Sequence, residues 1–227
     1  MSDSEEGGDC GNLFVNEAYT TKTFAFGAHS PLSLLVSSAA CTDHDLTGQL
    51  DWPGARLLCH WLALQPDALF AKPCLELGAG TGLTGLFWAS RGGEALLTDY
   101  HPVVLRLLRR NADAAAAAGA KVGVAKLPWG CADSITRLPR PCYEVLLGAD
   151  ILYPGSQRAL PKLMQTVTRL MSPGGCLFLC YCSRAATTDA ALAEALAEAG
   201  LEAAVAPGGG PFEEGGVSGT VYQVTRG

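Results

Sequence analysis

The feature that most limits how this chain can fold is a regular alternation of strand-like and helix-like segments from Lys72 onward. Short apolar runs typical of buried strands are separated by segments with the apolar spacing of helices. The predicted strands cover residues 72–78, 94–100, 121–127, 142–150, 176–182, 201–206 and 219–225. The predicted helices cover residues 81–93, 101–120, 156–175 and 188–200. This pattern predicts an α/β fold, namely a Rossmann-like, doubly wound, mostly parallel sheet of seven strands with helices on both faces.

The residues before Lys72 are predicted to belong to the same domain. Residues 12–50 contain two β-like runs, TFAFG and LSLLVSS, which predict a hairpin laid against the edge of the sheet. A helix is expected from Pro53, because proline is favoured in the first turn of a helix. No linker composition separates these segments, so we expect one domain over residues 12–227, with an N-terminal β extension and a core over residues 51–227.

The first eleven residues, MSDSEEGGDCG, are acidic and rich in small side chains. They lack the basic start and the apolar stretch of a signal peptide, so a disordered tail is expected over residues 1–11. No apolar run reaches the roughly 18 residues that a membrane span needs. These features predict a protein of the cytoplasm or the nucleus that does not insert into a membrane.

Composition argues against several kinds of site. The nine cysteines are scattered without paired spacing, which predicts free thiols and no metal site. The net charge of −6 and the absence of a basic stripe argue against nucleic acid and favour a basic partner or substrate. His101 precedes a helical proline and is expected to be a surface or capping residue. Few features suggest an oligomer interface, so a monomer is expected.

The stretch LELGAGTGLTG, residues 75–85, lies between a predicted strand and a predicted helix, where nucleotide cofactors bind. Its glycines, spaced G-x-G-x-G, allow a sharp turn and a close approach to a ligand. Asp99 ends the next predicted strand, where a carboxylate can bind the ribose of an adenosine. A dinucleotide-binding turn needs glycine where Leu83 stands, and Glu76 would repel a pyrophosphate. Glu76 suits an amino group and a sulfonium instead, so the loop favours S-adenosylmethionine over NAD.

Five motifs taken in order make the chain resemble a known family. They are LDWPGARL, LELGAGTGLTG, LLTDYHP, KLPWG and LLGADILYP, and the resemblance covers residues 45–182. Together they resemble seven-β-strand methyltransferase family 16, the group that includes the METTL21-type protein-lysine methyltransferases. The resemblance implies the class I methyltransferase fold, S-adenosylmethionine as cofactor and a protein partner as substrate. In most characterised members the acceptor is a lysine, and in a few it is a histidine or an arginine.

The resemblance also implies which residues contact the cofactor. These are Trp52, Glu76, Gly78, Ala79, Gly80, Asp99, Trp129 and Ala149. The turn Gly78–Gly80 would line the methionine end beside Glu76, and Asp99 would hold the ribose.

Two tryptophans are implied beside the cofactor. Trp129 would pack on the adenine ring, and Trp52 would close over the cofactor from the N-terminal side, while Ala149 would meet it at the end of the fourth predicted strand. Both tryptophans have a plain alternative, because large aromatic side chains are commonly core residues. Trp61 and Trp88 stand at helical core spacing, so both are expected to pack in the core.

Asp150 and Tyr153 follow the fourth predicted strand, and ADILYP matches the family's D/E-x-x-Y/F motif. Ligands bind outside the carboxyl ends of strands in such sheets, so both side chains are expected beside the transferred methyl group. Asp150 is expected mainly to bind and orient the incoming amine, with proton acceptance through water as a second role. Tyr153 would supply an aromatic wall and a hydroxyl contact. The alternative is a structural pair, with the carboxylate capping the next helix.

Two other functions stay open at this point. A small-amine methyltransferase would need a lid, for which the region before Trp52 is the candidate. A non-catalytic module that binds S-adenosylmethionine, or that has lost it, would have no need of Asp150 and Tyr153.

Overall fold

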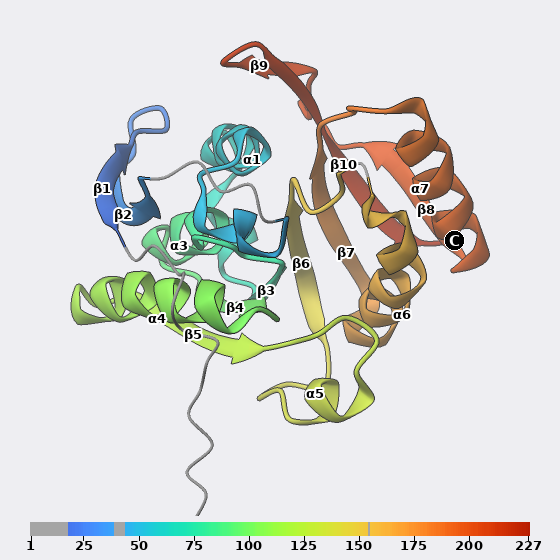
Figure 1. Cartoon of the computed structure of the whole chain (residues 1–227), viewed down its shortest axis with the longest axis horizontal. Helices are drawn as coiled ribbons and strands as arrows, with labels where there is room; N and C mark the ends of the chain where they lie inside the picture. Colours follow the sequence, from blue (N-terminus) through green and yellow to red (C-terminus); the bar gives the residue numbers. More distant parts are fainter. Residues whose placement is uncertain (1–17, 39–43, 154) are drawn as a thin grey trace, which may run out of the picture.

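The computed structural model describes residues 18–38, 44–153 and 155–227. Its main sheet has the strand order β5-β4-β3-β6-β7-β10-β8, with β9 paired to β10 (Figure 1). The strands of this sheet are β3 (Cys74–Leu77), β4 (Glu94–Asp99), β5 (Lys121–Lys126), β6 (Tyr143–Ala149), β7 (Met171–Tyr181), β8 (Leu201–Val205), β9 (Phe212–Glu214) and β10 (Val217–Arg226). Strands β3 to β7 are mutually parallel, and β10 runs antiparallel to β7, β8 and β9. The predicted Rossmann-like α/β fold is confirmed.

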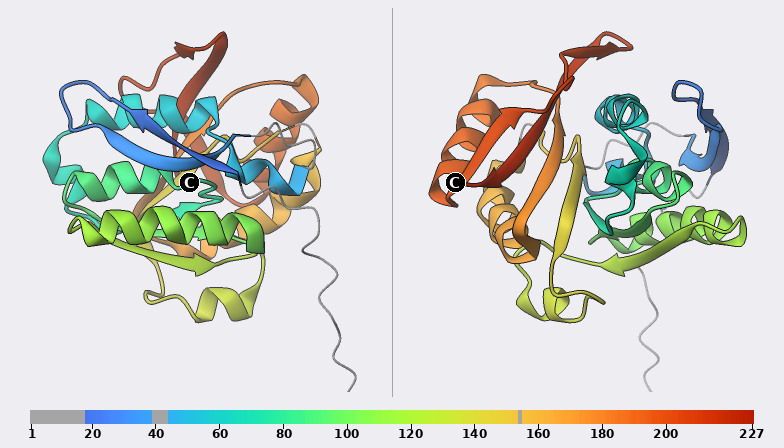
Figure 2. Two further views of the ribbon diagram at one scale, coloured as in Figure 1. Left: turned by 60° about the vertical axis from the view of Figure 1, so that its left-hand side comes forward. Right: turned by 180° about the vertical axis from the view of Figure 1, so that it is seen from behind.

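Helices cover both faces of the sheet, as Figures 1 and 2 show. They are α1 (Pro53–Ala63), α2 (Asp67–Phe70), α3 (Leu83–Ser90), α4 (Pro102–Ala117), α5 (Ala132–Thr136), α6 (Leu160–Leu170) and α7 (Ala186–Glu198), with 3-10 helices η2 (His44–Gln49) and η3 (Ser156–Ala159). One apolar core lies under α1, α3 and α4, and a second lies under α6 and α7. Trp61 and Trp88 are buried in the first core, as predicted.

The N-terminal extension forms the predicted hairpin, in which β1 (Tyr19–Phe24) pairs antiparallel with β2 (Leu32–Ser37). Its predicted position at the sheet edge is wrong, because β2 packs against helices α3 and α4. Asn111 of α4 explains this placement. Its side chain accepts a hydrogen bond from Leu35 N–H at 2.8 Å and donates to Leu35 O at 3.0 Å and to Thr81 O at 2.9 Å. One buried amide thus bonds the open edge of β2 to the helical layer.

Most boundaries shift by a few residues from the predictions, and two segments differ in kind. Strand β7 begins at Met171, before the predicted start at Cys176, because Met171 pairs with Tyr143 and an irregular register absorbs the residues that follow. Strand β9 lies between the predicted strands 201–206 and 219–225, where no element is predicted. It forms because Gly215 and Gly216 both have positive φ angles, 59° and 78°, and make the tight turn that joins β9 to β10. Figure 1 shows β9 projecting from the body of the molecule.

The predicted tail over residues 1–11 lies outside the described residues, and the single-domain boundary at residue 12 stays a prediction. Within the described ranges, no helix combines the length and the apolar character needed to cross a membrane.

Candidate active site

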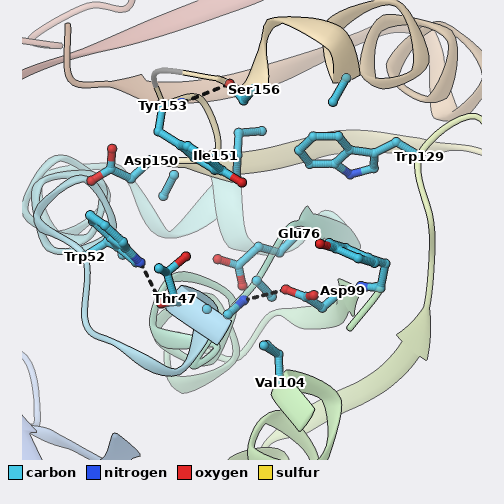
Figure 3. A pocket seen from close by; sticks show the side chains of 18 of the residues that line it. Thr47, Trp52, Glu76, Asp99, Val104, Trp129, Asp150, Ile151, Tyr153 and Ser156 are labelled. Atoms are coloured by element: carbon cyan, nitrogen blue, oxygen red, sulfur yellow. Dashed lines mark hydrogen bonds between the residues drawn. The ribbon is translucent and has the colours of Figure 1, made fainter. Parts of the chain in front are cut away.

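A pocket of about 400 Å³ lies at the carboxyl ends of β3, β4, β5 and β6 (Figure 3). This size falls within the roughly 300–1,000 Å³ of sites that bind small molecules and cofactors. All ten predicted site residues line it: Trp52, Glu76, Gly78, Ala79, Gly80, Asp99, Trp129, Ala149, Asp150 and Tyr153. The fold therefore brings the predicted cofactor and acceptor residues into one pocket.

The glycine turn between β3 and α3 forms the floor of the pocket. Gly78 and Gly80 have positive φ angles, 59° and 56°, that larger residues rarely adopt. A Cβ atom at Gly78 would lie 2.9 Å from Ile151 Cγ2, and one at Gly80 would lie 2.9 Å from Gly48 O. Both positions therefore need glycine for the backbone conformation and for space.

Asp99 ends β4 with its carboxylate held by three backbone N–H groups. Oδ1 accepts from Tyr100 at 2.7 Å and from His101 at 3.2 Å, and Oδ2 accepts from Gly80 at 3.2 Å. Burial raises the pKa of Asp99, and these hydrogen bonds act in the opposite direction. The carboxylate is thus fixed in the wall of the pocket. His101 caps α4, as predicted, because its Nδ1 accepts a hydrogen bond from Val103 N–H.

Glu76 lies near the centre of the pocket in Figure 3. Its side chain is on β3 and its residue is only 2% exposed, and Oε2 accepts a hydrogen bond from Gly85 N–H in the first turn of α3. Burial raises the pKa of this carboxyl to about 8, although the Gly85 hydrogen bond opposes the change. Among the described residues, no lysine, arginine or histidine forms an ion pair with Glu76. A cationic ligand group would be attracted to this carboxyl once it ionises.

The two predicted tryptophans stand at opposite ends of the pocket (Figure 3). Trp129 follows β5 and is half-buried. Trp52 immediately precedes α1, and its Nε1 donates a hydrogen bond to Thr47 O at 2.9 Å. Each therefore presents part of its ring to the pocket, unlike the fully packed Trp61 and Trp88.

Asp150 has an unusual backbone for a non-glycine residue, with φ of 55°. Its side chain is fully buried, and both carboxylate oxygens contact the guanidinium of Arg184, with Arg184 Nη2 at 2.8 Å from Oδ2. Gly54 N–H also donates to Oδ2, at 3.2 Å, so Asp150 caps α1 and not the helix that follows it in sequence. Tyr153 lines the pocket nearby, and its N–H donates to Ser156 Oγ at 3.0 Å.

Several lining residues were missed from the sequence. Thr47 and Gly48 come from η2, and Arg184 follows β7. Arg184 had a usable signal, because it stands just after a predicted strand that neighbours the strand of Asp150. The η2 residues lie in a stretch whose fold depends on packing against α4, and no local pattern marks them.

The described part of the chain contains no group of three or more histidine, cysteine, aspartate or glutamate side chains that could hold a metal ion. The lining of the pocket includes carboxylates, aromatic rings, glycines and two arginines, Arg158 and Arg184.

Comparison with known proteins places the chain among methyltransferases. A family model described as lysine methyltransferase matches residues 40–198. The chain is 34% identical over 134 residues to EEF1A lysine methyltransferase 3 of Mus musculus and 36% identical over 123 residues to protein N-lysine methyltransferase METTL21A of Danio rerio. These matches cover 59% and 53% of this chain. The chain spans about half the length of these curated relatives, 55% and 54%.

The fold is also similar to that of the T. thermophilus 16S rRNA N2 G1207 methyltransferase RsmC, solved in complex with AdoMet and guanosine. The TM-score is 0.59 at 16% identity, over 92% of this chain and 50% of that one. At this identity the likeness shows the fold alone. The family model, in contrast, matches well over half of the sequence. The chain therefore belongs to the lysine methyltransferase family whose motifs it carries.

Proposed function

We propose that this chain transfers the methyl group of S-adenosylmethionine to a lysine side chain of a partner protein. The observation that carries the proposal is one pocket with Asp99 and Trp129 at one end and Asp150 and Trp52 at the other (Figure 3). Family membership and the names of the curated relatives support the same activity. The particular substrates in those names are not assigned to this chain, which spans about half of each relative.

The residues of the pocket fit S-adenosylmethionine. The turn at Gly78 and Gly80 allows close backbone approach, and Asp99 in the pocket wall would accept hydrogen bonds from ribose hydroxyls. Trp129 offers a flat surface to adenine, and Glu76 offers a buried carboxyl to the cationic end of the cofactor. When bound, S-adenosylmethionine supplies a methyl group whose bond to a positively charged sulfur can break, with the bonding electrons returning to sulfur.

The chain's own task at the acceptor end is to receive an uncharged nitrogen and exclude water. A lysine side chain has an ordinary pKa of about 10.4, so its ammonium must lose a proton before its lone pair can form the new nitrogen–carbon bond. Trp52, Ile151 and Tyr153 give this end aromatic and apolar walls. Desolvation by such walls lowers the pKa of an entering amine, and the same walls hold it in line with the methyl group.

The proposal is tested with radiolabelled S-adenosylmethionine in a cell lysate, with protein and small-molecule fractions counted separately. Wild type should label a discrete protein band, and Asp99→Ala should abolish that label by weakening cofactor binding, which calorimetry measures directly. Asp113→Ala removes an exposed aspartate of α4 and should keep the label. Label in the small-molecule fraction alone would support a small-amine methyltransferase instead. Cofactor binding without label in any fraction would support a binding module.

The remaining expectations stay predictions. They are a cytoplasmic or nuclear location, a monomeric state and no binding of nucleic acid. The net charge of −6 supports the last of these, because binding to phosphate backbones usually relies on a basic surface.

A further inference from the structure

The carboxylate expected to receive the acceptor amine already holds a cation of this chain. Arg184 Nη1 contacts Asp150 Oδ1, and Arg184 Nη2 lies 2.8 Å from Oδ2. The Asp150 side chain is 0% exposed, whereas that of Arg184 is 26% exposed. The Arg184 guanidinium also lies 5.5 Å from the ring centroid of Trp52. Arg184 therefore contacts both Asp150 and Trp52, which lie together at one end of the pocket.

The backbone holds this ion pair in place. Asp150 N–H donates to Cys180 O of the neighbouring strand β7 at 3.1 Å, and Gly54 N–H donates to Oδ2 at 3.2 Å. A Cβ atom at Gly54 would lie 2.8 Å from Asp150 Cβ, so α1 reaches the carboxylate only because this residue is glycine. A two-point contact between guanidinium and carboxylate is stronger and more directional than a contact to a single ammonium. The pair is thus a fixed part of the pocket wall.

The pairing of Asp150 with Arg184 changes the charge that an entering lysine would have beside it. A free carboxylate within about 4–6 Å of an amine raises the amine pKa by about one to three units, which keeps it protonated and unreactive. A neutral aspartate–arginine pair removes this effect. The guanidinium itself stays charged at all relevant pH values.

We propose that Arg184 is a positioning residue that neutralises Asp150 and thereby keeps the acceptor amine in its uncharged, reactive form. The inference rests on the proposed methyl transfer to lysine. It assigns Asp150 a structural and electrostatic role, in which the carboxylate orients Arg184 and α1 instead of binding the amine as a free anion.

Other titratable groups surround the pair and must be held constant in any test. Glu76 of β3 and Tyr153 line the same pocket. Cys180 and Tyr181 end β7, and Cys182 follows it beside the pair. None of these residues changes in the variants below, so their titration contributes to every pH profile. Saturating S-adenosylmethionine keeps cofactor binding from limiting the rate.

The experiment measures the rate of methyl transfer against pH, with the protein band that wild type labels in lysate as acceptor. Arg184→Gln leaves Asp150 unpaired, so the acidic limb of the profile should move up by about one to three pH units. Arg184→Lys keeps the charge and should keep the limb near that of wild type. The double variant Asp150→Asn with Arg184→Gln removes both charges and should return the limb toward wild type. Thermal unfolding and cofactor affinity are measured for each variant.

Removing one partner of a buried pair can prevent folding, and the thermal unfolding measurements show which variants fold. Asp150→Asn alone provides a second comparison, in case Arg184→Gln does not fold. This variant keeps the Arg184 charge without its partner, and its acidic limb should lie below that of the double variant. The inference would be overturned if the acidic limb of the rate profile stayed in place in Arg184→Gln, or if it lay at the same pH in Asp150→Asn and in the double variant. Either result would leave methyl transfer itself intact. A wild type that labels no protein at any pH would overturn the proposed function, and the inference with it.

Discussion

Replacing Glu76 with glutamine tests how a buried carboxyl of the pocket affects folding. Burial raises the pKa of Glu76 from 4.5 to about 8 in the folded protein, against the opposing hydrogen bond from Gly85 N–H. The unfolded chain releases this proton near pH 4.5, whereas the folded protein holds it until the pH nears 8. The stability that comes from the bound proton is therefore fully present below pH 4.5 and is lost as the pH rises through 8.

The size of this effect follows from the two pKa values. They differ by about 3.5, and each unit corresponds to about 1.4 kcal/mol, which gives about 5 kcal/mol as an upper limit. Glutamine has nearly the same shape, carries no charge, and its amide oxygen can still accept the Gly85 hydrogen bond. We expect the free energy of unfolding of Glu76→Gln, minus that of wild type, to lie near zero at pH 4.5. It should then rise by several kcal/mol by pH 8.5.

The assay is urea unfolding of both proteins at several pH values from 4.5 to 9, without cofactor. Subtracting the two curves removes the contributions of all other titrating groups, which the two proteins share. Glu198→Gln changes an exposed glutamate of α7 and serves as the matched control, with a difference that should stay flat across this range. A flat difference for Glu76→Gln as well would refute the argument that burial holds the proton on Glu76.

Three other results are expected. The cofactor affinity of wild type, measured by calorimetry, should increase as the pH rises toward 8, because only ionised Glu76 attracts a cation. Glu76→Gln should abolish this increase, and an equal increase of affinity with pH in both proteins would contradict the prediction. Gly80→Ala should lower cofactor affinity at least tenfold, because its Cβ would lie 2.9 Å from Gly48 O. Gly119→Ala is the control: its φ is 94° and its Cβ would meet open space, so it should only lower the free energy of unfolding by about 1–2 kcal/mol through backbone strain. Asn111→Ala should lower the free energy of unfolding by about 1–3 kcal/mol, because Leu35 loses both of its partners on α4, and unchanged stability would contradict this.

The sheet could be predicted from local patterns because each parallel strand contains a short, mainly apolar run between punctuating residues. Pro53 and Pro102 lie in the first turns of α1 and α4 as expected. The errors occur where several residues act together over a distance. The position of the hairpin depends on one side chain of α4, Asn111, and the early start of β7 depends on the partner that Tyr143 supplies.

The site residues were predictable where a residue stands at a strand end next to a recognisable turn. Asp99 and Asp150 are such residues, and both line the pocket. The ion pair of Asp150 with Arg184 joins positions 34 residues apart, and the contact of Gly48 with the glycine turn depends on how η2 packs. Periodicity indicates which side chains share a face of a helix or strand. It does not indicate which loop will lie across a given strand end.

The two buried carboxylates at the ends of β3 and β6 differ in whether a cation of the chain pairs with them, and the difference suits the proposed chemistry. Glu76 has a backbone N–H partner but forms no ion pair among the described residues, so it remains available to a cation at the cost of a raised pKa. Asp150 has a guanidinium and a helix N–H group, so its charge is already compensated. Under the proposed function, a cationic cofactor would be attracted to Glu76 once it ionises, while an acceptor amine beside Asp150 would not be held as an ammonium. The pocket would bind one positive charge tightly and allow a second group to arrive uncharged, which is the condition that methyl transfer to nitrogen requires.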